Sequence, residues 1–308
     1  MLRYTLRRLV LFVPVLVGVS LVSFSLLHLI PGDPATILAG VESRPEELQA
    51  VRHEFGLDLP LPVQYGRYVA RALQGDLGIS VHTREPVAAT VIGRMRFSAL
   101  LTVLSLTLAV VIGVSAGMLA ALRHNSWLDS VIMLLALIGV SIPSFWLGLL
   151  LLLVFAGMLH VLPAGGSGGA QHLVLPVVVL GLAGAPVIAR LTRAAMLEVL
   201  GQDNIRTLRA HGLPEVVVVC RHGLRNALNP VITVVGLQFG LLLAGAVIVE
   251  TVFALPGIGR LMITAVFARD YPVIQGGMML IAVAVVLVNL ATDLTYAWVN
   301  PRIRGEQA

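Results

Sequence analysis

The sequence predicts an all-α, polytopic membrane protein with six transmembrane helices and an external insertion after the first helix. The first observation is composition: 57% of the 308 residues are hydrophobic and 12% are charged, which is too apolar for a soluble domain. The second is that several apolar runs approach the roughly 20 residues that a helix needs to cross a bilayer. The third is that the arginines of short loops gather at alternate ends of these runs, which predicts their orientation.

The first predicted span, Leu9–Ile30, follows a short basic N-terminus. The run is too long for a secretory signal peptide, and the PGDP sequence after it offers no small-residue cleavage site. Arg3, Arg7 and Arg8 place the start of the span in the cytoplasm. Residues 1–30 are therefore predicted to form a cytoplasmic tail and the first transmembrane helix.

Residues 31–97 are rich in Arg, Asp, Glu, Gln, Pro and Gly, and are predicted to form an external subdomain. A short amphipathic helix is expected at Pro45–Arg52, with its proline in the first turn. Leu59–Pro62 is expected to be extended, Gln64–Leu73 to be helical, and Gly75–Gly78 to form a turn. The arginines of this subdomain do not contradict an external position, since long translocated loops escape the positive-inside rule.

Residues 98–300 are predicted to form a core of five further helices. The expected spans are Ser98–Leu122, Val131–Leu162, Leu173–Ala189, Pro230–Phe253 and Pro272–Val299. Val131–Leu162 is too long for one straight crossing, and Ser141–Ser144, which contains a proline, should kink it. Leu255–Tyr271 is expected to be an external re-entrant or amphipathic segment.

The distribution of arginines supports this topology. The predicted inside ends carry Arg3, Arg7, Arg8, Arg123, Arg190, Arg193, Arg206, Arg209, Arg221, Arg225, Arg302 and Arg304. The short outside loops carry Arg260 and Arg269. Both termini are therefore predicted to be cytoplasmic, with residues 301–308 as the C-terminal tail.

The cytoplasmic loop, residues 190–229, is predicted to contain a short helix. Asp203 can cap a helix over Asn204–His211, because its carboxylate can accept hydrogen bonds from the free N–H groups of the first turn. Gly212 supplies the backbone freedom that ends such a helix, and Pro214 fits the first turn of the next one.

Asn229–Pro230 repeats the pattern of a cap followed by a proline where the chain becomes apolar again. The loop is thus expected to hold a short helix across the membrane face, a rigid turn and a helix that leads into the bilayer. The pattern leaves two roles open: a handle for another protein, or a basic loop that holds lipid phosphates.

The residue types present exclude several kinds of chemistry. All 21 basic residues are arginine, which excludes a phosphate-binding Walker loop and a Schiff-base lysine, so any ATP site must lie on another chain. Cys220 is the single cysteine, which excludes an intrachain disulfide and a thiolate metal cluster. The arginines are spread over loops without interleaved aromatic residues, so nucleic-acid binding is not expected.

The sequences RTLRAHGL at 206–213 and RHGLRNALNPVIT at 221–233 resemble the cytoplasmic loop of ABC-importer permeases, specifically the first permease subunit of the dipeptide/oligopeptide/nickel group. Leu208 stands where that family usually has alanine, and His211 where it usually has lysine. The resemblance continues along the chain in PGDP (31–34), GDLG (75–78), SIPSFWLG (141–148), ARLTRAAMLEVL (189–200), GLQFG (236–240), ETVFALPGIGRL (250–261), RDYPVIQG (269–276) and DLTYAWVNPRIR (293–304).

This resemblance implies a type I ABC-importer transmembrane domain in a bacterial inner membrane, whose short helix docks on a cytoplasmic ATPase. The implied coupling residues are Arg206, Thr207, Leu208, Arg209, Ala210, His211, Gly212, Leu213, Pro214 and Glu215. The implied partners are a second homologous permease in a heterodimer, two ABC ATPase subunits that bind ATP and magnesium, and an extracytoplasmic substrate-binding protein. The chain itself would hold no cofactor or metal. The implied cargo is a di- or oligopeptide, with nickel or another small solute as the alternative.

Several residues within the spans are candidates for the translocation path, at the predicted kink or in the middle of a span. They are Ser141, Ser144, Phe145, Gln238 and Asn289. The last two either line a polar path or tie helices together. Glu250 and Asp293 lie near the ends of spans, and for them structural ion pairs are the preferred interpretation over a role in transport.

Two other functions would need features that this sequence does not clearly contain. An ion-coupled secondary transporter would need inverted repeats and acidic residues near the middle of the membrane. An intramembrane serine protease would need a serine and a histidine that face each other, and Ser141 or Ser144 with His160 is the best available pair.

Overall fold

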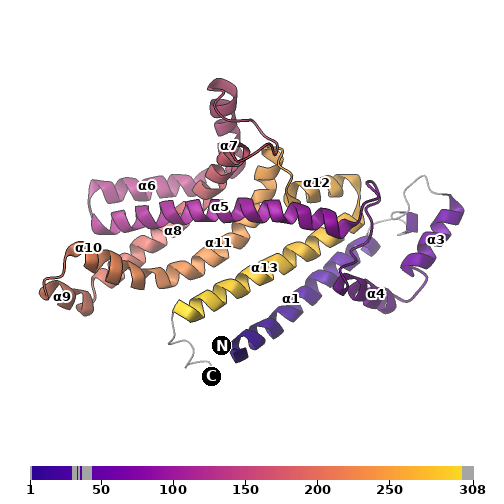
Figure 1. Ribbon diagram of the computed structural model, residues 1–308, viewed down its shortest axis with the longest axis horizontal. Coiled ribbons are helices and arrows are strands. Elements are labelled where there is room, and N and C mark those ends of the chain that lie inside the picture. Colours follow the sequence, from indigo (N-terminus) through magenta and orange to yellow (C-terminus); the bar gives the residue numbers. More distant parts are fainter. Residues whose placement is uncertain (1, 30–32, 34, 37–43, 300–308) are drawn as a thin grey trace. The chain divides into compact units, whose positions relative to one another are not determined.

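The computed structural model describes residues 2–29, 33, 35–36 and 44–299, which are helical almost throughout (Figure 1). Within those ranges there is no strand, only an isolated bridge between Ile79 and Pro86. Among the described residues, five helices are long and apolar enough to cross a membrane, and there are six spans if one sharply bent pair of helices counts as a single span. This result confirms the predicted all-α membrane class, and it gives the predicted six spans when the bent pair is counted as one.

The chain divides into two compact units. The first comprises Met1–Ser98 and Pro256–Leu287, and the second comprises Ala99–Leu255 and Val288–Ala308. Two long helices, α5 (Val87–Leu122) and α13 (Tyr271–Val299), contribute residues to both units. One break between the units, after Ser98, lies next to the boundary predicted at residue 97, whereas the breaks after Leu255 and Leu287 fall inside the predicted five-helix core.

The first unit contains α1 (Leu2–Leu29), α3 (Pro45–Phe55), α4 (Leu61–Leu73) and α12 (Ile258–Ala268). Its core joins Leu27 of α1 to buried residues of α5, α12 and α13. They are Val87, Val91, Met95, Ile258, Ala265, Tyr271, Val273 and Ile274. The buried Asp270 fixes the loop before α5, because it bonds to the Ser80 hydroxyl and to the Val81 N–H.

Two sequence predictions in this unit are wrong at their boundaries. Leu61 and Pro62 are helical and not extended, because a proline fits the first turn of a helix, where its missing N–H donor is not needed. The helix after the loop begins at Val87 and not at Ser98, so eleven residues assigned to the external subdomain form its first turns. At 36 residues α5 is about 54 Å long, far more than a bilayer core of about 30 Å.

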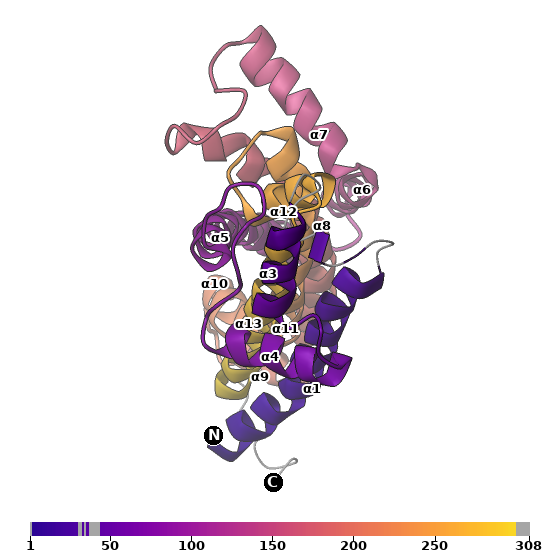
Figure 2. The same ribbon diagram turned by 90° about the vertical axis from the view of Figure 1, so that its right-hand side faces the viewer.

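The second unit contains a broken span and a helical hairpin. The broken span consists of α6 (Trp127–Ser141), α7 (Ser144–Leu151) and the π-helix η1 (Leu152–Met158). The halves before and after Ser141 meet at 99°, and α7 rises away from the end of α6 in Figure 2. The predicted kink is therefore confirmed, and it is a near-perpendicular break.

The rest of this unit is α8 (Gln171–Leu200), α9 (Asp203–Ala210), α10 (Glu215–Val217), the π-helix η2 (Val218–Gly223) and α11 (Leu224–Val252). Helix α8 packs on α11 and on α6 (Figure 1). It continues eleven residues beyond the predicted end at Ala189. The non-helical part of the predicted cytoplasmic loop is thus shorter than expected, and only Gly201 and Gln202 separate α8 from α9.

Candidate functional site

Helix α9 is anchored by one apolar face and presents a polar face to its surroundings. Ile205 is completely buried and Leu208 is half-buried, and the two lie three residues apart on the same side of the helix. They pack into a cluster that includes Met196 and Val199 of α8 and Val218 of η2. An eight-residue helix is marginal in isolation, so this packing is what holds α9 in place.

Of the ten predicted coupling residues, only Leu208 and Leu213 are half-buried and the other eight are exposed. They form one continuous surface over α9 and the turn that follows it. Its charged members are Arg206, Arg209 and Glu215. This surface, residues 206–215, is called the α9 surface below.

The predicted cap at the start of α9 is wrong. Asp203 is the first helical residue, and Gln202 occupies the cap position without a side-chain hydrogen bond to the helix. The Asp203 side chain is 97% exposed and lies 3.7 Å from a guanidinium nitrogen of Arg206. Its carboxylate therefore interacts with the positive end of the helix dipole through charge and not through a capping hydrogen bond.

The predicted end of α9 is confirmed. Gly212 has a φ of +76°, a conformation that glycine adopts without the penalty of a Cβ. Its N–H donates to the carbonyl of Arg209, and the Leu213 N–H donates to the carbonyl of Leu208. A Cβ at Gly212 would meet no atom within 4 Å in the part of the chain that the structure describes, so the glycine faces open space there.

An ion pair closes the turn between α9 and α10. The Arg209 guanidinium donates to both carboxylate oxygens of Glu215, at 2.6 Å and 3.1 Å. This two-point contact raises the pKa of Arg209, which keeps its charge in place. Pro214 lies at the cap position before α10, one residue earlier than predicted. The turn is therefore held by a glycine, a proline and an ion pair.

The helix after the turn enters the bundle without a second start. From Glu215 the chain is helical to Val252 through η2, so Pro230 lies inside α11 and Asn229 caps nothing. The prediction of a cap at Asn229–Pro230 is wrong, because the helix is already established upstream and a span tolerates an internal proline. The π-helix lies directly behind α9 and contacts it, and such wide turns are frequent at functional sites.

Sequence reasoning missed the ion pair at the base of α8. The Arg193 guanidinium donates to both oxygens of Asp129 on α6, at 2.6 Å and 2.7 Å, and the Asp129 side chain is almost completely buried. Asp129 also accepts from the Asn125 N–H, and its own N–H donates to the Ser126 hydroxyl. The Ser-x-x-Asp spacing at 126–129 is a helix-start signature that could have revealed this aspartate.

The structure does not gather the five predicted path residues at one site. Ser144 lines an apolar cavity of about 410 Å³ between α5, α6, α7 and α8, and the other four are absent from its walls. Gln238 is buried and its amide lies 3.5 Å from the Gly184 carbonyl, so it ties α11 to α8. Ser141 and Phe145 are exposed and Asn289 is half-buried. Their role in a path stays a prediction.

The best serine–histidine pair that the sequence offered to a protease, Ser141 with His160, is not joined by a hydrogen bond. The Ser141 hydroxyl donates to the Leu137 carbonyl, and a ring nitrogen of His160 lies 3.2 Å from the Met158 carbonyl. Each group is thus engaged with its own helix end and neither activates the other, as a nucleophile and its base would have to do.

Two family models match most of the chain. The model of the binding-protein-dependent transport system inner membrane component matches residues 113–305, and the model of the N-terminal membrane component of such systems matches residues 1–104. The two models leave unmatched a short stretch within α5, residues 105–112, and the last three residues of the chain.

Similar proteins align over the whole length. The chain is 46% identical over 304 residues to the glutathione transport system permease protein of Escherichia coli strain CFT073, with 99% of each chain covered. It is 45% identical, with the same coverage, to the proteins of that name from Escherichia coli K12 and from Shigella flexneri strain 8401.

Two solved structures share the fold. They are inward-facing conformations of the MetNI methionine ABC transporter, matched with TM-scores of 0.60 and 0.57 at 21% identity. The matched region covers 68% of this chain and 96% of the other in both cases. This likeness confirms the predicted type of transmembrane fold.

Proposed function

Because this chain belongs to the binding-protein-dependent transport system inner membrane components, as an ABC-importer permease of the dipeptide/oligopeptide group, we propose that it couples through the α9 surface to a cytoplasmic ATPase. As a member of this family it is a multi-pass inner-membrane subunit without catalysis of its own, and it works with ATPases and a substrate-binding protein. The proposal assigns the ATPase contact to residues 206–215 and both chain termini to the cytoplasm.

The observation that carries the proposal is the construction of α9. Its polar face is exposed, whereas Ile205 is locked into a cluster shared by α5, α8, η2 and α11. A push on the exposed face would therefore move the ends of these helices together, since a close-packed core transmits displacement and does not absorb it. The turn at Gly212 and the Arg209–Glu215 ion pair restrict movement between α9 and the helix that follows it.

The energy source is proposed to lie outside this chain. The sequence contains no lysine and so no Walker loop, and we assign ATP and magnesium to two partner ATPase subunits. The ATPases can shift the permease between outward- and inward-facing states only by binding the two states with different affinity. We further propose a heterodimer with a second, homologous permease, and a docking role for residues 31–97 toward the substrate-binding protein.

The proposed cargo is a short peptide. Proteins 45–46% identical to this chain over nearly their full length are named glutathione transport permeases, which supports a small peptide over nickel. The cargo can be identified by measuring ATP-driven uptake of glutathione, a dipeptide or nickel, each offered separately, into vesicles that contain the assembled transporter. Uptake of nickel alone would contradict the peptide assignment.

Gly212→Trp tests the docking role. The indole would project into space that this chain leaves empty, where we place the ATPase. We expect insertion into the membrane to be retained and co-purification of the ATPase to be lost. Gly75→Trp is the matched control, because Gly75 has a similar φ of +82° and an equally empty surrounding, but lies in the predicted external segment. Equal ATPase recovery with both variants would refute the assignment.

A further inference from the structure

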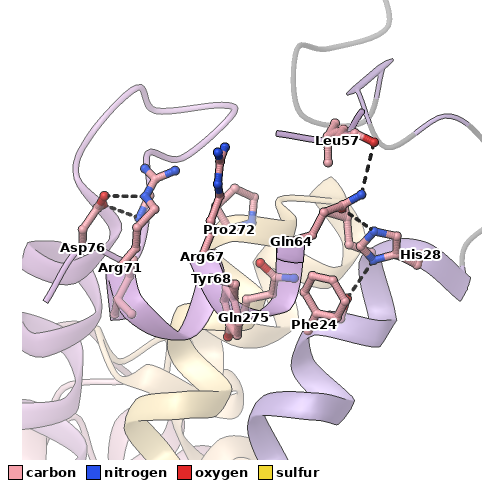
Figure 3. Close-up of a pocket in the computed structure, with 13 residues that line it drawn as sticks. Phe24, His28, Leu57, Gln64, Arg67, Tyr68, Arg71, Asp76, Pro272 and Gln275 are labelled. Atoms are coloured by element: carbon pink, nitrogen blue, oxygen red, sulfur yellow. Dashed lines mark hydrogen bonds and ion pairs between the residues drawn. The ribbon is translucent and has the colours of Figure 1, made fainter. Parts of the chain in front are cut away.

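A small cavity lies in the first unit, where α4 crosses α1 (Figure 3). Its volume is about 110 Å³. Phe24 and Leu27 of α1, together with Leu57, Leu77 and Pro272, supply its apolar wall. Pockets for drug-sized ligands measure about 300–1,000 Å³, so this cavity has room for the polar end of a ligand but not for a whole ligand of that size or for a peptide.

Most polar side chains around the cavity are already engaged. Gln64 donates to the carbonyls of Leu57 and Leu59, and its oxygen lies 3.1 Å from a ring nitrogen of His28. Arg71 donates to Asp76, and the Gly78 N–H together with Arg71 holds the pKa of Asp76 below its usual value. Asp76 therefore stays ionised and neutralises Arg71.

Arg67 differs from these neighbours. It is exposed, and in the part of the chain that the structure describes no hydrogen bond or ion pair involves its guanidinium. Figure 3 shows it standing between the Arg71–Asp76 pair and Gln64, without an interaction drawn to any residue. The cavity therefore combines an apolar wall with one uncompensated positive charge at its edge, a combination suited to an amphiphilic anion.

The position of α4 along α1 indicates the source of such an anion. The apolar stretch Val10–Leu29 is 20 residues long, about 30 Å, and so matches the thickness of a bilayer core. Ser20 lies near its middle and bonds to the Tyr65 hydroxyl at 2.7 Å, while Ser23 bonds to Tyr68 at 3.2 Å. With this stretch across the bilayer, α4 lies within the leaflet on the Leu29 side.

The surface of α4 fits this location. Leu61, Val63 and Leu73 are exposed, and Leu73 reaches 83%. The serine and tyrosine hydroxyls between α1 and α4 satisfy one another, as groups surrounded by hydrocarbon must. A long arginine side chain such as that of Arg67 can extend from within the leaflet toward the phosphates.

We propose that this cavity binds the head group of an anionic phospholipid, with Arg67 on the phosphate and the acyl chains leaving the cavity past the half-buried Phe24. The external segment 31–97 would then be partly a membrane-embedded element, with α4 as a lipid-anchored clamp on α1. A soluble anion such as inorganic phosphate or glutathione shares the charge but not the apolar tail.

The first test counts phosphatidylglycerol bound to the assembled transporter by native mass spectrometry, with phosphatidylcholine as the neutral comparison. We expect Arg67→Gln to weaken phosphatidylglycerol binding about fivefold, the factor that one cation near an anionic surface contributes, and Arg67→Lys to retain most of it. Arg84→Gln is the matched control, because Arg84 is exposed in the neighbouring loop but absent from the cavity wall. Unchanged binding in Arg67→Gln, or equal losses in both glutamine variants, would overturn the proposal. So would displacement of the lipid by millimolar phosphate or glutathione.

The second test measures the depth of α4 and does not depend on lipid counting. Cys220 is the single cysteine, so Cys220→Ser allows a spin label to be placed at Leu73→Cys or, as the aqueous control, at Arg84→Cys. We expect the label at position 73 to be accessible to oxygen and shielded from a water-soluble nickel reagent, with the reverse at position 84. Equal exposure of both labels to nickel would show that α4 lies outside the bilayer and would overturn the proposal.

Discussion

The substitution Ile205→Ala should detach α9 from the bundle while leaving the transmembrane helices folded. Ile205 is completely buried and is the only fully buried residue of α9. The change removes three carbon atoms, which at about 0.8 kcal/mol each amounts to about 2.4 kcal/mol before any cavity term. At about 1.4 kcal/mol per factor of ten, the population of detached α9 should rise by roughly 50-fold.

Hydrogen exchange of the assembled transporter measures this local opening directly. The amides of α9 should exchange roughly 50-fold faster in the variant, whereas those of α8 and α11 should change little, because the remaining cluster still packs. Stimulation of ATP hydrolysis by the loaded binding protein should fall, because a loosely attached α9 passes less displacement between the ATPase and the helix bundle. Basal hydrolysis should be retained.

Two variants serve as controls for this prediction. Ile205→Val removes one carbon atom and should cost about 1 kcal/mol, so its exchange should lie between wild type and the alanine variant. Thr207→Ala lies on the exposed side of α9 and should leave the packing intact. The reasoning would be refuted if α9 exchanged at the wild-type rate in Ile205→Ala, or if it exchanged faster while stimulation by the binding protein stayed unchanged.

Two further predictions concern stability. Gly113→Ala should destabilise the bundle by about 1–3 kcal/mol in reversible unfolding, because its Cβ would lie 2.8 Å from the Ala185 carbonyl oxygen. Gly240→Ala, whose Cβ would have no described atom within 4 Å, should be neutral or stabilising. A larger loss of stability for Gly240→Ala than for Gly113→Ala would contradict this account. Asp129→Asn should lower the free energy of unfolding by about 3 kcal/mol, which is at the lower end for a broken buried pair because the Arg193 side chain is 24% exposed. Asp203→Asn, at a carboxylate that is 97% exposed, should have no measurable effect. Similar unfolding of the two variants would show that the buried pair contributes nothing to stability.

The sequence alone determined the class of protein and the position of the loop at residues 190–229 that contains the α9 surface. Composition and run length were sufficient for an all-α membrane protein, because a bilayer requires about 20 apolar residues per span. The positions of Gly212 and of Ser141–Ser144 were predicted for a similar reason: a helix end at a glycine and a break at a proline are local properties of the backbone.

Only the tertiary structure decided which side chains meet. The Asp129–Arg193 pair joins residues 64 positions apart, and the Ser20–Tyr65 contact joins residues 45 positions apart, so no local pattern could have matched them. The start of α5 at Val87 and the end of α8 at Leu200 were misplaced for a related reason. The parts of these helices that extend past the apolar run carry no continuous apolar pattern, and packing against neighbouring elements stabilises them. The burial of Ile205, on which the attachment of α9 depends, results from packing among four helical elements that the chain order does not reveal.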